Sequence, residues 1–354
     1  MRDTGSQRRR VRPALFGRPA VVALMLMASA FAALAAAADP ALATPTYQLT
    51  EYRSVGQDRS FRCDLIEDLS GPPGLVVFGG SRATRFRPAD FRLYAGLSAV
   101  NCATQNFRPE DAWAISNFMF SRAPKVKLRC FMAVQATTFS DAPLAPGLLY
   151  DPRLSQWFPA SLVAQQRALA GPVYAPNMLA NKRYDARGLL LWNGYDARRA
   201  AGVPLEKTLA LYTRSMLRKA SDTTPVQQVR SHLYFRKTIQ LFNRHGVTPV
   251  VVIMPYQPSV LAAFREAGWE VKVDRLRTYL AGLQKRYELE VVDLLDIATF
   301  GGTPTGFYDG AHITAENARR IVKYSVGVAP ECFRGIRYEV PPPRRGCARC
   351  PYAR

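Results

Sequence analysis

Short apolar segments alternate with amphipathic segments along most of the chain. Five runs rich in Val, Ile and Leu have the length of a strand: 74–78, 94–101, 126–134, 247–255 and 289–295. Nearly continuous apolar residues of that length are typical of strands buried on both faces. Helical periodicity lies between and after them, at 109–121, 225–244, 271–287 and 314–325. Because strands and helices alternate, we predict an α/β fold in which helices cover a central parallel sheet of about five strands.

One long segment interrupts this pattern. Residues 142–224 contain Pro, Tyr, Trp and Arg in irregular order, and the tetrapeptide YDAR occurs there twice, at 184–187 and 195–198. An irregular segment of that length inside a compact domain is usually functional. We therefore predict an insertion that packs over the sheet and lines a cleft. A small helical subdomain without contact to the substrate is the alternative.

Both ends of the chain differ from the central pattern. A basic stretch at 1–19 precedes the apolar run 20–38, and small residues follow it. This order predicts that residues 1–43 are a secretory signal peptide or an uncleaved signal anchor. The protein is then exported to the periplasm or another extracytoplasmic site, either free or held at the membrane by 20–38. The folded domain is expected at 44–330, before a basic tail rich in Pro, Arg and Cys at 331–354.

The chain is strongly basic, with a formal net charge of +21. The segment 1–43 carries six Arg and two Asp, so the remainder is also strongly basic. In a cytosolic protein this balance would suggest nucleic acid. Export points instead to anionic polymers of the cell envelope, and we predict no nucleic-acid partner. The alternative is a charge that serves solubility alone.

The six cysteines are compatible with disulfides in an exported protein. Cys347 and Cys350 have the spacing of half a zinc site, but no second pair of Cys or His follows them. We therefore predict a local or tail-to-core disulfide, no metal site and no cofactor.

A serine lies where a parallel sheet usually binds its ligand. Ser81 directly follows Gly79 and Gly80 at the carboxyl end of the first apolar run. Loops at the carboxyl ends of parallel strands converge on ligands. Glycines allow a sharp turn that leaves the serine hydroxyl uncovered and lets peptide N–H groups face an oxyanion. A common Gly-Ser turn without function is the alternative.

A histidine that could activate this serine lies in the sequence YDGAH near the end of the chain. His312 is one of three histidines and follows the fifth apolar run, with Asp309 three residues before it. This loop also reaches the carboxyl edge of the sheet, so His312 can act as the base for Ser81 while Asp309 holds its imidazole. The alternative is a simple helix start with Thr314 as its cap.

Four sequence blocks resemble the SGNH, or GDSL-like, hydrolases. In chain order they are VVFGGSR, VNCATQNFRPEDAW, PYQP and FYDGAHITAENARRI. The resemblance spans roughly residues 70–328, apart from 142–224, and is greatest to the exported branch of DltD-like and alginate O-acetylation proteins. It implies a flavodoxin-like three-layer sandwich with a long insertion. It also implies that Ser81 is the nucleophile, His312 the base and Asp309 its partner.

The family also supplies donors for the oxyanion, and here the chain departs from the usual pattern. Gly80 stands where many members have Asp. Asn106 is the best match for the backbone donor of the second block. The asparagine of the third block is absent, and Gln135 is the candidate that replaces its side chain. Gly80, Asn106 and Gln135 are therefore the candidate oxyanion residues.

These observations predict an exported serine esterase or O-acyltransferase that moves an acyl group, expected to be acetyl, on a cell-envelope polysaccharide or related glycan. The expected partners are an acylated glycan or another anionic envelope polymer, and a membrane-bound protein as acyl donor. Arg82 and Arg85 are candidates for binding an anionic substrate group, or else they pair with carboxylates. The alternative function is a non-catalytic SGNH-like protein that binds glycan or assists envelope assembly.

Overall fold

The computed structural model describes residues 47–48, 58–170, 183–192, 194–222 and 228–334. The expected signal segment, Cys347, Cys350 and almost all of the tail lie outside these residues. All described residues belong to one compact unit. Within the described part, no helix is long and apolar enough to cross a membrane.

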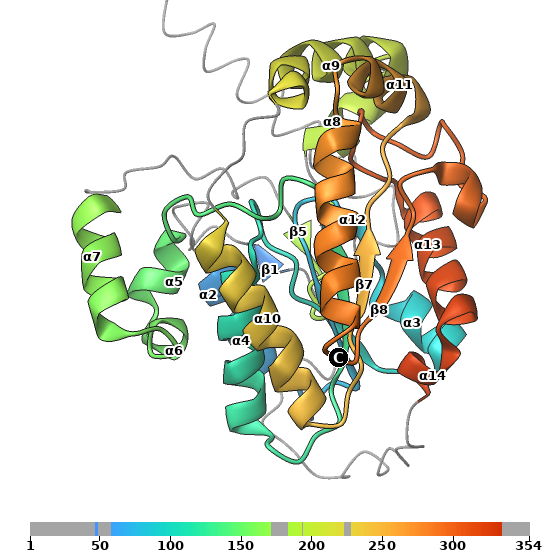
Figure 1. Ribbon diagram of the computed structural model, residues 1–354. Coiled ribbons are helices and arrows are strands. Elements are labelled where there is room, and N and C mark those ends of the chain that lie inside the picture. The colour runs from blue at the N-terminus through green and yellow to red at the C-terminus, as the bar shows by residue number, and fades with distance from the viewer. Residues whose placement is uncertain (1–46, 49–57, 171–182, 193, 223–227, 335–354) are drawn as a thin grey trace, which may run out of the picture. The chain divides into compact units, whose positions relative to one another are not determined.

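Five parallel strands form the central sheet (Figure 1). They are β2 (Leu75–Phe78), β3 (Ala99–Asn101), β4 (Arg129–Val134), β7 (Val250–Ile253) and β8 (Glu290–Asp293). Their spatial order is β3-β2-β4-β7-β8, and every neighbouring pair is parallel. The predicted α/β class with a parallel sheet is confirmed. The order is compatible with a flavodoxin-like sandwich.

Alternating side chains of the strands supply two separate cores. In β2, Val76 and Phe78 pack on one face and Leu75 and Val77 on the other, all four fully buried. Helices on the first face are α2 (Asp58–Glu67), α4 (Pro109–Arg122), α10 (Val229–Arg244) and α12 (Glu270–Gln284). Helices on the second are α3 (Pro88–Ala95), α13 (Ala315–Val328) and α14 (Pro330–Phe333). Burial on both faces explains why β2 and β7 consist of apolar residues alone.

Two boundaries differ from those expected. The apolar run 94–101 is not one strand, because Gly96 takes a left-handed conformation with φ 68° and ends α3 before the strand begins at Ala99. At the carboxyl end, Cys332 and Phe333 are buried in the second core. The folded part therefore extends past the expected limit at residue 330.

The segment 142–224 contains several short elements in two groups. The first group comprises α5 (Pro146–Tyr150), α6 (Pro152–Ser155) and α7 (Ala160–Ala170). The second comprises β5 (Arg183–Tyr184), β6 (Leu190–Trp192), α8 (Gly194–Ala200) and α9 (Leu205–Ser221). β5 and β6 join β1 (Tyr47–Gln48) in a small antiparallel sheet. Figure 1 shows α8 and α9 near α11 (Pro258–Glu266), beyond the carboxyl ends of the central strands.

Candidate functional site

A tight turn after β2 holds Ser81 at the edge of the sheet. Gly79 has φ 151°, and a Cβ there would lie 2.6 Å from the Cβ of Ala83 and 2.9 Å from that of Ala133. Only glycine fits here, where the chain passes between the following 3-10 turn and β4. The turn continues as a 3-10 helix, with Ala83 N–H donating to Gly80 O at 2.9 Å and Thr84 Oγ1 donating to Ser81 O at 2.7 Å.

The loop between β8 and α13 presents Asp309 and His312 to this turn. Asp309 Oδ1 accepts hydrogen bonds from the backbone N–H groups of Ala311 and His312, both at 2.8 Å. Tyr308 N–H donates to His312 O at 2.8 Å and closes the loop. The backbone of the loop therefore orients the Asp309 carboxylate independently of its contact with the His312 side chain.

Thr314 and Asn317 support the same loop from α13. Thr314 occupies the N-cap position, but its side chain makes no capping hydrogen bond. Asn317 is fully buried and exchanges two hydrogen bonds with the backbone of Thr303, each 3.0 Å long. The expected helix start at Thr314 is present, and it coexists with the side-chain arrangement described next.

Ser81, His312 and Asp309 form a continuous hydrogen-bonded chain. Ser81 Oγ lies 2.8 Å from His312 Nε2, and His312 Nδ1 lies 2.8 Å from Asp309 Oδ2. Burial alone would raise the pKa of Asp309, but hydrogen bonds from His312 and from two backbone N–H groups hold that pKa below its usual value. The ionised carboxylate accepts from Nδ1–H, which leaves Nε2 free to accept the serine proton.

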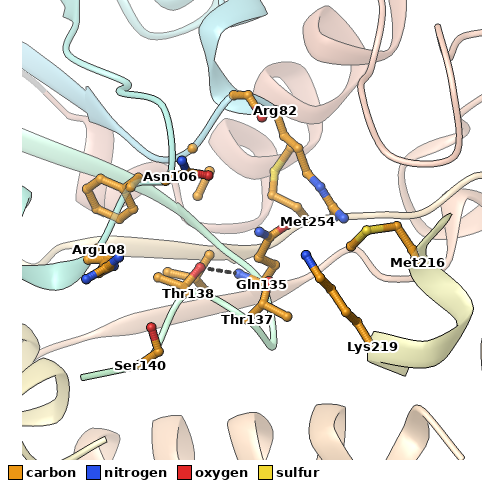
Figure 2. Close-up of a pocket in the computed structure, with 15 residues that line it drawn as sticks. Arg82, Asn106, Arg108, Gln135, Thr137, Thr138, Ser140, Met216, Lys219 and Met254 are labelled. Carbon is orange, nitrogen blue, oxygen red and sulfur yellow. Dashed lines mark hydrogen bonds between the residues drawn. The ribbon is translucent and has the colours of Figure 1, made fainter. Parts of the chain in front are cut away.

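Ser81 opens into a pocket of about 320 Å³ (Figure 2). Its walls come from the loops after β2, β3, β4 and β7 and from α9. The lining residues are Gly80, Ser81, Arg82, Asn106, Phe107, Arg108, Ala133, Val134, Gln135, Thr137, Thr138, Ser140, Met216, Lys219 and Met254. All three candidate oxyanion residues therefore share this pocket with the serine.

Two of these oxyanion candidates have unusual local structure. Asn106 has φ 50° and is the only non-glycine residue with positive φ in the part of the chain described here. Such residues cluster at functional sites, and Asn tolerates this conformation better than most. Gln135 anchors its own backbone N–H on Thr138 Oγ1 at 3.0 Å, whereas its side-chain Oε1 is buried without a partner. That amide retains hydrogen-bonding capacity for a ligand.

The two candidate arginines have different surroundings. Arg82 lines the pocket, with its guanidinium 3.9 Å above the Tyr256 ring. Arg85 does not line the pocket. Its guanidinium pairs with Asp196 and donates to the backbone oxygens of Leu190 and Leu191 at 2.9 and 3.2 Å. Arg82 therefore borders the pocket while its guanidinium donates to Pro255 O at 3.4 Å, and Arg85 joins the sheet to the inserted segment.

Sequence reasoning missed two residues that the inserted segment brings to the site. Tyr195 Oη lies 3.4 Å from His312 Nε2, and the ring centroids are 4.5 Å apart. Lys219 extends from α9 across the pocket towards Gln135 and Met254 (Figure 2). The second YDAR copy was the one available signal for Tyr195. Nothing in the local pattern of α9 distinguished Lys219 from its other basic residues.

The remaining histidines and cysteines are structural in character. His232 stacks on Tyr279 at 3.9 Å and His245 on Phe120 at 3.8 Å. Cys63, Cys102, Cys130 and Cys332 are buried free thiols. Burial raises the pKa of Cys102 to about 12, which disfavours its thiolate. Among the described residues, no group of three or more His, Cys, Asp or Glu is suited to a metal ion.

No family model matches this chain, and no curated protein matches it. Assignment of the site therefore depends on the contacts between its own residues.

Proposed function

We propose that the protein is an exported serine esterase or O-acyltransferase of the SGNH type, built on a flavodoxin-like three-layer sandwich. The observation that carries this proposal is the hydrogen-bonded chain from Ser81 through His312 to Asp309, with both key distances at 2.8 Å. Its position beyond the carboxyl ends of parallel strands supports it further.

In this proposal the chain performs acyl transfer in two steps. His312 Nε2 takes the Ser81 proton as Oγ attacks the acyl carbonyl, and Asp309 stabilises the imidazolium. His312 then gives this proton to the departing alcohol oxygen as the ester C–O bond breaks, which leaves an acyl-serine. Water or a sugar hydroxyl next attacks the acyl-serine, gives its proton to His312, and releases Ser81. Water as the attacking group gives an esterase, and a sugar hydroxyl gives a transferase.

The oxyanion of each tetrahedral intermediate is stabilised by N–H donors in the pocket. The backbone N–H groups of Gly80 and Asn106 and the side-chain amide of Gln135 are the proposed set. One such donor is worth about 2.7–4 kcal/mol of transition-state stabilisation. Gln135 lines the same pocket as Ser81, which supports its place in this set.

The pocket supports an acylated anionic glycan as the substrate. Its volume of about 320 Å³ exceeds the needs of an acetyl group and leaves room for part of a sugar unit. Arg82, Arg108 and Lys219 contribute three cations to its lining. The basic composition of the whole chain favours an anionic polymer of the envelope in the same way. A membrane-bound acyl donor protein remains the proposed partner for a transferase.

The decisive experiment combines a substitution with an active-site probe. Ser81→Ala should abolish hydrolysis of p-nitrophenyl acetate, with a loss of roughly 10³-fold or more, and should leave the thermal midpoint unchanged. A fluorophosphonate probe should label the wild type and fail to label this variant. Undiminished hydrolysis in Ser81→Ala would overturn the assignment.

A non-catalytic glycan-binding protein is the second candidate. The observation that favours it is that no asparagine directly follows β4, the place where the SGNH hydrolases supply a side-chain donor. This candidate predicts binding of an anionic glycan without labelling of Ser81 by the fluorophosphonate.

A further inference from the structure

Two hydroxyl groups converge on one nitrogen of His312. Ser81 Oγ lies 2.8 Å from Nε2, and Tyr195 Oη lies 3.4 Å from the same atom. The Tyr195 ring also packs on the imidazole, with centroids 4.5 Å apart and planes inclined by 32°. Tyr195 belongs to α8, so the inserted segment supplies it.

Tyr195 is held there by its neighbour in the sequence. Asp196 pairs with Arg85, and Asp196 Oδ1 accepts a hydrogen bond from Tyr308 Oη at 2.8 Å. The side chains of Arg85 and Asp196 are only 10% and 12% exposed. Tyr308 in turn stacks on Tyr195 at 6.1 Å. Because this ion pair is shielded from water, it fixes α8 against the 3-10 turn that follows Ser81.

The position of Tyr195 matches one requirement of acyl transfer. The alcohol oxygen that leaves the ester, or attacks the acyl-serine, must exchange its proton with His312 Nε2 and therefore must lie beside that nitrogen. Tyr195 Oη borders the same space. Neither Tyr195 nor His312 lines the pocket that contains Gln135 and Lys219, so Tyr195 contacts the catalytic histidine from outside that pocket.

We propose that Tyr195 is a catalytic residue that donates a hydrogen bond to the alcohol oxygen of the substrate as that oxygen exchanges its proton with His312. This assignment rests on the proposed acyl-transfer function and names the residue that recognises the sugar hydroxyl. During acylation the proton of Ser81 passes through Nε2 to the alcohol oxygen as the C–O bond breaks. Tyr195 keeps its own proton throughout and stabilises the negative charge that develops on that oxygen.

The environment of Tyr195 keeps it a donor. Burial raises the pKa of its hydroxyl, and the neighbouring carboxylate of Asp309 raises this pKa further. Tyr195 is thus protonated at neutral pH and can donate its hydroxyl hydrogen.

The benefit of a hydrogen bond from Tyr195 depends on how basic the leaving alcohol is, so esters of different alcohols test this role. A p-nitrophenolate group leaves without a proton and gains little from a hydrogen-bond donor, whereas ethoxide needs both a proton and stabilisation of its charge. We would compare kcat/KM for p-nitrophenyl, phenyl and ethyl acetate in the wild type and in Tyr195→Phe. The variant should lose about five- to tenfold for ethyl acetate and less than about twofold for p-nitrophenyl acetate, with phenyl acetate between them.

A matched control removes the same hydroxyl elsewhere. Tyr150 lies on α5 and is 53% exposed, so Tyr150→Phe should change none of the three rates. An equal loss for all three esters in Tyr195→Phe would show that Tyr195 only orients His312, and unchanged rates would show that it has no role. Either result overturns the proposal while the esterase activity of the wild type stands. A wild type without Ser81-dependent hydrolysis overturns the proposed function and this assignment together.

Discussion

Asp309 Oδ2 lies 2.8 Å from His312 Nδ1, and the two residues belong to one turn of four residues. The backbone N–H groups of Ala311 and His312 bind the other carboxylate oxygen. These hydrogen bonds lower the pKa of the carboxyl group and hold the carboxylate in place, and the carboxylate selects the tautomer in which Nδ1 carries the proton. Ser81, from the turn after β2, completes the hydrogen-bonded chain that begins with this local unit.

Replacing the charge of Asp309 without changing its size should disable the site. In Asp309→Asn the amide can bind the unprotonated form of Nδ1, which places the proton on Nε2 and prevents His312 from accepting one from Ser81. We expect kcat for p-nitrophenyl acetate to fall on the order of 10⁴-fold. Steady-state kinetics test this, with circular dichroism as the control for folding. A decrease of less than about tenfold would exclude this role of Asp309.

The same carboxylate should make stability depend on pH. Although burial opposes ionisation, hydrogen bonds lower the folded-state pKa of Asp309 below its ordinary value of 3.8. Its contribution is therefore fully present above the ordinary pKa and disappears as the pH falls through the lower folded-state pKa. Urea unfolding of the wild type and of Asp309→Asn should show a larger difference at about pH 7 than at about pH 3. A difference that grows on acidification would contradict the lowered pKa.

Gly79→Ala should displace Ser81 as well as destabilise the fold. The added Cβ clashes with Ala83 and Ala133, and the φ of 151° is strained for any residue other than glycine. We expect the free energy of unfolding to fall by about 2–4 kcal/mol, together with much of the activity. Gly96→Ala is the matched control, because its φ is 68° but no atom lies within 4 Å of the added Cβ. It should cost about 1–2 kcal/mol and leave kcat unchanged.

Lys219 should matter only for an anionic substrate. In Lys219→Gln we expect kcat/KM for an acetylated polyuronate to fall about two- to fivefold at low salt, because an exposed cation contributes modestly. Hydrolysis of neutral p-nitrophenyl acetate should not change. The difference should shrink at about 1 M salt, where charges are screened over roughly 3 Å. Lys285→Gln, outside the pocket, serves as the control. An equal loss of kcat/KM for the neutral ester in Lys219→Gln would show that the charge of Lys219 does not act on an anionic substrate.

Much of the sheet could be predicted from the sequence, because a strand buried on both faces requires a continuous run of apolar residues. The run 126–134 contains β4, and the run 247–255 contains β7. The prediction of one strand over 94–101 is wrong, because the apolar end of α3 continues across Gly96 into β3. In that stretch, periodicity alone does not distinguish the end of a helix from the start of a strand.

The duplicated tetrapeptide YDAR shows that local sequence alone does not determine secondary structure. Tyr184 of the first YDAR copy lies in β5, where it is buried and its ring faces the Arg62 guanidinium at 4.8 Å. Tyr195 of the second copy lies in α8 and contacts His312. The same four residues thus form a strand end followed by a turn in one place and part of a helix in the other, because their tertiary neighbours differ.

The sequence by itself determined the class of fold and the proximity of Ser81 to His312, although they are 231 positions apart. That was possible because the carboxyl ends of parallel strands meet at one edge of a sheet. Only the tertiary structure decided that Tyr195 and Lys219 reach this site and that Arg85 is occupied by Asp196. The physical reason is that a local pattern specifies which face of an element is buried, whereas packing of the whole chain decides which element covers that face.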